Sequence, residues 1–299
     1  MFASVKALLS SIVDYAGLFP PAQLDLREAM ANYAKYRISP NNWMLGRFVL
    51  PASRLEEFEA LLPAFPLKQW SLSVIISGDL ELEIERVQLL NNRNKIAITA
   101  LEFPPIQPQE IKRLVSFLPA KIDSFFEIPL NADLEVYMSV LQHTAASAKI
   151  RTGGTTTAAF PSINQLSQCI FSFAKAQVSF KATAGLHHPL AANHRLTSDV
   201  DSPSTTMQGF LNVAVLAAFV YWQKVTPEDA LELLKESSID GFQFNADSIS
   251  WSDSPKERLR DRHLNLTELK EARQRFFRSF GSCSFQEPIE DLKHLKLLS

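Results

Sequence analysis

Short apolar runs alternate with helical segments along almost the whole chain, and this alternation limits the possible folds more than any other feature. Eight runs have the length of strands, and the segments between them show the 3.6-residue period of amphipathic helices. Eight strand–helix units in about 250 residues predict a closed (β/α)8 barrel. The runner-up is an open doubly wound parallel sheet, which usually carries a glycine-rich nucleotide turn after its first strand. Residues 13–21, which read VDYAGLFPP, contain no such turn.

The expected elements follow one another without long gaps. Strands are predicted at Ser11–Tyr15, Arg47–Leu50, Leu72–Ser77, Ala97–Phe103, Ser124–Ile128, Ala148–Thr152, Val178–Thr183 and Gly241–Asn245. Helices are predicted at Leu24–Tyr36, Arg54–Leu62, Leu80–Asn91, Gln109–Leu118, Ala132–Thr144, Ser162–Lys175, Met207–Gln223 and Pro227–Glu236. We therefore expect the barrel to occupy residues 1–250. Residues 251–299 are expected to form a C-terminal helical extension that packs on the barrel or at a subunit interface.

Composition is typical of a soluble globular protein. Of 299 residues, 46% are hydrophobic and 21% are charged, and a net charge of −2 gives no reason to expect a nucleic acid or an anionic membrane as partner. The longest apolar stretch, Phe210 to Trp222, is shorter than the roughly 20 residues that span a bilayer. Two distant cysteines, Cys169 and Cys283, and no signal-peptide pattern predict a reduced, cytoplasmic protein. The apolar helix and the charged tail are candidate surfaces for a homo-oligomer.

Charged and polar side chains lie near the ends of the predicted strands. In a (β/α)8 barrel, the carboxyl ends of the strands converge on one mouth, where the active site lies. Taken in order, these residues are Asp14, Arg47, Glu102, Glu127, Lys149 with Arg151, Lys181 with Thr183, and Asn245. Lys149 and Arg151 are two residues apart and share a face of their strand, as do Lys181 and Thr183.

Buried ammonium and carboxylate groups are costly unless they are paired or have a task. Both lysines and both glutamates stand close to a glycine or proline that ends the strand, where sites are found. We therefore interpret Lys149, Lys181, Glu102 and Glu127 as catalytic candidates. The alternative is a structural layer of ion pairs that fills the interior of the barrel.

A glycine-rich loop follows the first lysine strand. Thr152, Gly153, Gly154 and Thr155 offer backbone N–H groups that can hold a phosphate or a carboxylate. The neighbouring Arg151 favours an anionic substrate group, with Thr183, Asp14, Asn245 and Arg47 as further binding candidates. An ordinary strand-to-helix turn is the alternative for the loop, and a strand-start position is the alternative for Arg47.

Two adjacent histidines follow the second lysine strand. His187 and His188 stand in a loop that ends in Pro189. One of them is a candidate general acid or base, because the pKa of histidine lies near the working pH. A divalent metal held by one histidine with Glu102 or Glu127 is the runner-up, and we expect no metal or other cofactor.

The lysine strands are similar to those of a known enzyme family. Lys149-x-x-Thr152-Gly153, followed by Lys181-Ala182-x-x-Gly185, resembles the paired strands of deoxyribose-phosphate aldolases, which are class I aldolases on the (β/α)8 barrel. The resemblance implies that Lys149 forms a Schiff base with the substrate carbonyl and that Lys181 lowers the pKa of Lys149. It is confined to residues 149–185, and the proton-relay aspartate of that family has no match, so Glu102 or Glu127 would take its place. The chain as a whole also resembles a bacterial family of such barrels, which implies no particular activity.

Three hypotheses follow from these patterns. The leading one is an aldolase-type lyase that acts on a small carbonyl or oxo-acid substrate with an anionic group. The second is a metal-assisted acid–base lyase or isomerase that uses Glu102, Glu127 and a histidine. The third is a non-catalytic barrel that binds a small anion or serves in an assembly.

Overall fold

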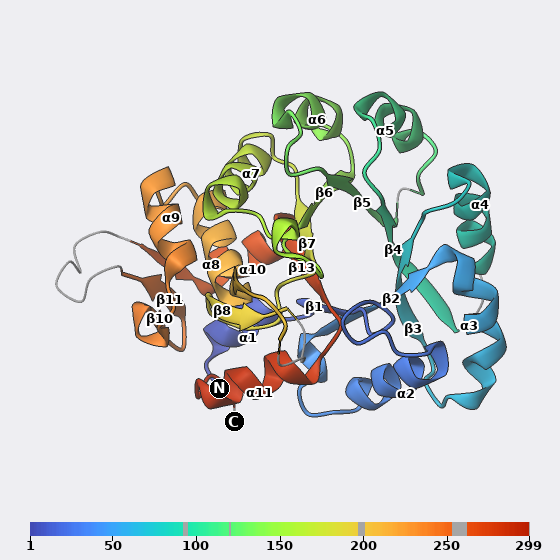
Figure 1. Cartoon of the computed structure of the whole chain (residues 1–299), viewed down its shortest axis with the longest axis horizontal. Helices are drawn as coiled ribbons and strands as arrows, with labels where there is room; N and C mark the ends of the chain where they lie inside the picture. The colour runs from blue at the N-terminus through green and yellow to red at the C-terminus, as the bar shows by residue number, and fades with distance from the viewer. Residues whose placement is uncertain (92–94, 120, 197–200, 253–261, 299) are drawn as a thin grey trace.

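The computed structural model describes residues 1–91, 95–119, 121–196, 201–252 and 262–298, and it contains a closed barrel of eight parallel strands (Figure 1). Around the barrel the order is β1, β2, β3, β4, β5, β6, β7 and β13, and β13 pairs with β1 to close the ring. The strands are β1 (Val13–Tyr15), β2 (Leu45–Pro51), β3 (Trp70–Ile75), β4 (Ile96–Phe103), β5 (Asp123–Ile128), β6 (Ala146–Arg151), β7 (Phe180–Thr183) and β13 (Phe277–Ser282). The predicted (β/α)8 barrel is thereby confirmed, and the open sheet is wrong.

Helices connect the strands and surround the barrel (Figure 1). They are α1 (Ala3–Leu9), α2 (Leu26–Arg37), α3 (Leu55–Leu61), α4 (Leu80–Leu90), α5 (Pro108–Val115), α6 (Leu134–Leu141), α7 (Ile163–Lys175), α8 (Phe210–Tyr221), α9 (Pro227–Lys235), α10 (Leu266–Arg275) and α11 (Gln286–His294). Short 3-10 turns lie at Asn42–Met44, Ala52–Arg54, Leu62–Ala64, Thr157–Ala159 and Ile239–Gly241. Side-chain caps fix several starts, and the Ser162 hydroxyl, for example, accepts a hydrogen bond from the Gln165 backbone N–H at 3.2 Å.

The eighth barrel strand is not the one that the sequence predicted. Gly241–Asn245 was expected to close the barrel, but Phe242–Phe244 forms β10 of a separate antiparallel sheet with β11 (Ser248–Trp251) and β12 (His263–Asn265). The closing strand is β13, which lies inside the segment 251–299 that was expected to be an extension. The domain boundary at residue 250 is therefore wrong, because the barrel is incomplete without the C-terminal residues.

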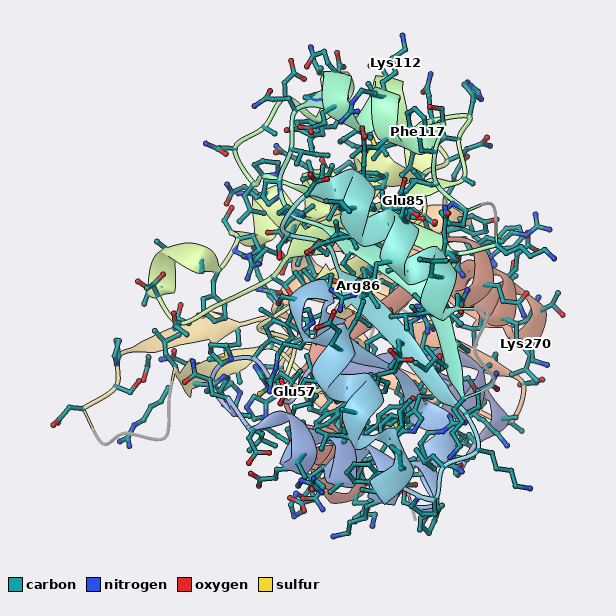
Figure 2. All side chains as sticks on the ribbon, turned by 90° about the vertical axis from the view of Figure 1, so that its right-hand side faces the viewer. Glu57, Glu85, Arg86, Lys112, Phe117 and Lys270 are labelled. Carbon is teal, nitrogen blue, oxygen red and sulfur yellow. The ribbon has the colours of Figure 1, made fainter. Side chains whose placement is uncertain are left out.

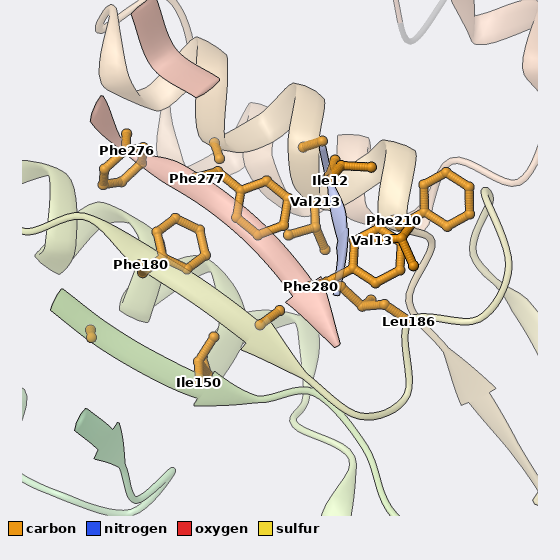
Figure 3. Packing of buried hydrophobic residues seen from close by; sticks show 14 of the residues in the cluster. Ile12, Val13, Ile150, Phe180, Leu186, Phe210, Val213, Phe276, Phe277 and Phe280 are labelled. Carbon is orange, nitrogen blue, oxygen red and sulfur yellow. The ribbon is translucent and has the colours of Figure 1, made fainter. Parts of the chain in front are cut away.

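The pattern of β13 explains both its place and why it escaped prediction. On its outer side, Phe280 stacks on Phe210 of α8 with ring centroids 5.1 Å apart, and Phe277 lies 5.0 Å from the Phe180 ring of β7 (Figure 3). On its inner side, Ser279 is buried and donates a hydrogen bond to Asp14. The usual barrel strand has branched apolar residues on its inner face, and β13 does not, so its sequence has the pattern of an exposed terminal segment.

The apolar helix α8 is buried by its own chain. Every residue from Phe210 to Val220 is at most 3% exposed, so this helix offers no surface for the homo-oligomer contact that was one expectation. Asn212 is buried there too, and its amide donates to the backbone carbonyls of Leu233 and Glu236 at 2.8 Å each. The other helices are amphipathic, as Glu57 of α3 and Glu85 of α4 illustrate on the outer surface (Figure 2). Among the described residues, no helix has the length and apolar character needed to cross a membrane.

Candidate functional site

A cavity of about 910 Å³ opens at the carboxyl ends of the barrel strands. The barrel residues that line it include Glu102 of β4, Glu127 of β5, Lys149 and Arg151 of β6, and Thr183 of β7. Loop residues complete the wall, among them Gly154, Thr155, Phe160, Gly185, His187, His188 and Arg195. We call this space the carboxyl-end cavity. It is the mouth at which residues from separate strands meet in a barrel of this kind.

Lys149 lies at the inner end of this cavity between two carboxylates. Parallel pairing sets Glu127 of β5 beside Lys149, and Lys149 beside Lys181 of β7. The Nζ atom of Lys149 is 3.1 Å from Oε2 of Glu127 and 3.5 Å from Oε2 of Glu102. Lys149 is 4% exposed, yet it lines the cavity, so a small molecule can meet its ammonium group without the barrel opening.

Lys181 lies deeper and is fully buried. Its Nζ donates to Oδ2 of Asp14 at 2.7 Å and to Oε1 of Glu102 at 2.6 Å, and it is not among the residues that line the carboxyl-end cavity. Burial alone would lower the pKa of Lys181, but the charges of Asp14 and Glu102 outweigh burial and raise that pKa above its ordinary value. Lys181 is therefore a permanent cation behind Lys149.

Glu102 is the carboxylate that both lysines share. Its Oε1 also accepts a hydrogen bond from the Ser73 hydroxyl at 2.7 Å. Burial would raise the pKa of Glu102, but Lys181 and Lys149 outweigh that effect and lower it to about 2. The group is consequently ionised at neutral pH and is a poor proton acceptor.

These pairs belong to a longer series of ion pairs, which we call the charge chain. From the amino ends of the strands to the carboxyl ends, its members are Arg278, Asp123, Arg47, Asp14, Lys181, Glu102, Lys149, Glu127 and Arg151, and each is ion-paired with the next. The longest N···O distance in the series is 3.8 Å, between Arg47 and Asp14. Cations and anions alternate along the whole series. The predicted ion-pair layer and the predicted site are thus parts of one structure, and its outer end meets the carboxyl-end cavity.

Three of the predicted binding residues lie elsewhere. Arg47 is the third residue of β2, pairs with Asp14 and Asp123 inside the barrel, and lines a second cavity at the amino ends of the strands. Asp14 is fully buried inside the barrel and lines that same second cavity. Asn245 follows β10 outside the barrel, and its backbone carbonyl accepts a hydrogen bond from the Ser4 hydroxyl at 2.5 Å. Alternation along a strand predicts the face on which a side chain lies, but it does not predict which end of the barrel is nearer.

The glycine-rich loop divides into a structural half and a lining half. Thr152 is buried, and its hydroxyl donates to the backbone carbonyl of Ala184. Gly153 packs on Gly185, so closely that a Cβ on Gly153 would lie 2.6 Å from the Cα of Gly185. Gly154 and Thr155 line the cavity together with Arg151. Thr152 and Gly153 therefore hold the ends of β6 and β7 together, and the second half of the loop lines the carboxyl-end cavity.

The two histidines are paired with acids of α11. Nδ1 of His187 is 3.3 Å from Oε2 of Glu287, and Nδ1 of His188 is 2.7 Å from Oδ2 of Asp291. Burial opposes protonation of His187, but hydrogen bonds to Cys283 and Glu287 outweigh it and raise the pKa of His187 to about 9. His187 is consequently a cation at neutral pH, so it offers a positive charge and not a general base.

Sequence reasoning missed several residues of the site. Arg195 on β8 (Ala192–Arg195), which pairs with β9 (Ser204–Met207), lines the carboxyl-end cavity, and so do Cys283 and Glu287. The last two follow β13, and they would have been candidates had that strand been placed in the barrel. Within the described residues, no group of three or more His, Cys, Asp or Glu side chains has the arrangement of a metal site, and Glu102 and Glu127 both lie against lysines.

Comparisons with models of protein families, with curated proteins and with solved structures found no match. The residues at the carboxyl-end cavity are therefore the basis for inferring a function.

Proposed function

We propose that the chain is a lyase of the class I aldolase type, in which Lys149 forms a Schiff base with the carbonyl group of a small anionic substrate. The observation that carries the proposal is the position of Lys149, whose ammonium group lies at the cavity and within 3.1 Å of the Glu127 carboxylate. An ion-pair layer with a purely structural role needs no access to a cavity of about 910 Å³.

Lys149 is a better candidate nucleophile than Lys181. Lys181 donates hydrogen bonds to two carboxylates, does not line the cavity and has a raised pKa, so its amine is not available. The two lysines stand at the same level on neighbouring strands, and Lys149 is the one that lines the cavity. The carboxylate of Glu102 lies between the two ammonium groups.

Glu127 is the proposed proton carrier for the reaction. It accepts a proton from the Lys149 ammonium, and the neutral amine forms a C–N bond with the carbonyl carbon while the π electron pair moves to oxygen. Glu127 returns the proton to that oxygen and then removes one from the nitrogen. Its final donation lets the hydroxyl group leave as water and leaves a protonated C=N bond. That iminium group accepts the electron pair of the Cα–Cβ bond of the substrate when this bond breaks, while the β-hydroxyl group gives its proton to Glu127 and becomes the carbonyl group of the fragment that leaves. Glu127 then protonates the remaining enamine at Cα, and water hydrolyses the C=N bond and frees Lys149.

Cations around the cavity favour a substrate with a phosphate or carboxylate group. The side chain of Arg151 is 45% exposed and hydrogen-bonds Glu127 through Nε at 3.0 Å, which leaves part of its guanidinium group facing the cavity. Arg195 and the protonated His187 line the same space. Together with Gly154 and Thr155 they offer charge-assisted donors for an anion.

Reductive trapping tests this proposal directly. The protein is incubated with small 2-oxo acids and with phosphorylated aldehydes, then treated with borohydride, digested and analysed by mass spectrometry. The expected result is a mass increase on the peptide that contains Lys149, equal to the mass of the substrate less one oxygen atom, because Schiff-base formation releases water and reduction adds two hydrogen atoms. Glu127→Gln should slow trapping at Lys149, because the proton carrier is lost while the amine stays.

A matched control separates catalysis from general lysine reactivity. Lys175 is the last residue of α7, on the outside of the barrel, and Lys175→Met should leave trapping unchanged. Lys149→Met should abolish it. If the whole panel leaves Lys149 unmodified, or if Lys149→Met is trapped as well as the unaltered protein, the Schiff-base proposal is wrong.

A further inference from the structure

The second cavity lies at the opposite end of the barrel and is strongly cationic. It has a volume of about 830 Å³ and shares no lining residue with the carboxyl-end cavity. Six of its described lining residues are basic, namely Lys6, Arg37, Arg47, Lys270, Arg273 and Arg278, and Asp14 is the one acid among them. We call this space the amino-end cavity. Such a concentration of positive charge is unusual in a chain whose net charge is −2.

Arg273 is a buried member of this set, and no ion pair with a described carboxylate balances its charge. It is 8% exposed, and its Nη2 donates to the backbone carbonyls of Ser10 at 3.2 Å and Arg278 at 2.8 Å. Among the described residues, its Nε and Nη1 have no hydrogen-bond partner and no carboxylate forms an ion pair with it. Its guanidinium carbon lies 5.5 Å from the centre of the Phe277 ring, which is a weak substitute for an anion.

The acids near Arg273 already serve other cations. Asp123 lies 2.5 Å from Arg47 and 2.9 Å from Arg278, and Asp14 pairs with Lys181 and Arg47. Burial, followed by the charge of Arg278, lowers the pKa of Arg273 to about 9. Burying an arginine with unsatisfied donors costs free energy, and a bound anion would reduce that cost by accepting hydrogen bonds from Arg273.

We propose that the amino-end cavity is a binding site for a multiply charged anion with a phosphate group. Arginine forks match the oxygen geometry of phosphate. Two of the lining arginines are neighbours, since the Arg273 guanidinium donates to the backbone carbonyl of Arg278. Lys270 of α10 and Lys6 of α1 are exposed and lie at the surface end of the cavity, where they attract the ligand; Figure 2 shows Lys270 at the outer surface. The volume of about 830 Å³ accommodates a phosphorylated small molecule as well as phosphate itself.

The position of this site differs from that of the proposed catalytic site, so the two proposals stand independently. The amino-end cavity contains no residue that is proposed to react. It is linked to Lys149 only through the charge chain, by way of Arg47, Asp14, Lys181 and Glu102.

Calorimetric titration with inorganic phosphate and with pyrophosphate, against chloride at equal ionic strength, tests the site. Lys270→Glu is compared with Arg275→Glu, since both reverse one charge on α10 but only Lys270 lines the cavity. We expect Lys270→Glu to raise the dissociation constant of pyrophosphate about tenfold and Arg275→Glu to change it less than twofold. Arg151→Ala, at the other end of the barrel, can remove a separate binding event at the carboxyl-end cavity, but it should leave the binding event that Lys270→Glu weakens.

Each contrary result has a distinct meaning. No heat of binding with either anion overturns the proposal, as does equal weakening by Lys270→Glu and Arg275→Glu, which would indicate general electrostatics. Loss in Arg151→Ala of the binding event that Lys270→Glu weakens would place the anion in the carboxyl-end cavity and also overturns it. Pyrophosphate binding much tighter than phosphate supports an occupant with two phosphate groups, and equal binding supports one.

Discussion

Replacing Lys181 by methionine removes the central cation of the charge chain and leaves two carboxylates without their strongest partner. Lys181 is fully buried, and Asp14 and Glu102 are at most 2% exposed, so water cannot take its place. Removing one member of a buried ion pair typically costs about 3–5 kcal/mol. We expect Lys181→Met to lower the free energy of unfolding by this amount at pH 7.

The loss must depend on pH. In the unaltered protein the pKa of Glu102 is about 2 against an ordinary 4.5, so its contribution, about 3 kcal/mol, is present above pH 4.5 and is lost as the pH falls toward 2. Without Lys181, we expect burial to outweigh the remaining charge of Lys149 and to raise the pKa of Glu102, so the variant should gain stability as the pH falls from 7 to 5. The difference between the two proteins should therefore shrink at lower pH.

Urea denaturation followed by tryptophan fluorescence and circular dichroism at pH 7 and pH 5 measures both effects. The double variant Lys181→Met, Glu102→Gln restores the alternation of charges on either side of the gap, with Asp14 on Arg47 and Lys149 on Glu127. It should lose about 2–3 kcal/mol less than the sum of the single variants. A loss below about 1 kcal/mol for Lys181→Met, the same loss at both pH values, or additive single variants would refute the reasoning.

Three further outcomes follow from other contacts. Glu287→Gln removes a partner of His187. The pKa of His187 is about 9, so the protonated imidazole stabilises the folded state fully below pH 6.5, and this stabilisation is lost as the pH rises through 9. In thermal unfolding the variant should be less stable than the unaltered protein by about 1 kcal/mol at pH 6 and equally stable above pH 9.5. Gly185→Ala should lower the free energy of unfolding in urea by more than about 2 kcal/mol, because φ is +78° and the new Cβ would lie 2.5 Å from the Thr152 carbonyl oxygen. Gly281→Ala is the control: its Cβ would lie 3.6 Å from the nearest atom, and its stability should change by less than about 1 kcal/mol. Asn212→Leu leaves one buried and one partly buried carbonyl without their donor and should cost about 2–4 kcal/mol, and a loss below about 1 kcal/mol would contradict that role.

The first seven barrel strands could be predicted because each joins an apolar run to an amphipathic helix. β2, for example, covers the predicted Arg47–Leu50 and extends it at both ends to Leu45–Pro51. The eighth could not be predicted in this way, since Ser279 and Gly281 of β13 face a polar interior. Phe242 and Phe244 alternate more convincingly, but they form an outer sheet, because a periodic pattern carries no information about the partner strand.

The candidate site was predictable in its composition and less so in its depth. Charged residues in short apolar strands indicated Lys149, Glu102 and Glu127 as members, and the strand order brings them together. The sequence did not distinguish the accessible Lys149 from the enclosed Lys181, since both stand at the same level on neighbouring strands. That difference arises from the partners across the barrel, among them Asp14, which is 167 residues distant from Lys181 in the chain.

The alternation of sign along the charge chain also restricts how this protein can vary. A single reversal, such as lysine to glutamate at position 181, would set three carboxylates side by side in the dry centre of the barrel. Neutral replacements are tolerable only when an acid and a base disappear together, so positions 14, 102 and 181 should change in concert among natural variants. The charged residues of the barrel interior are thus expected to be kept or replaced together, although they lie on strands that are far apart in the chain.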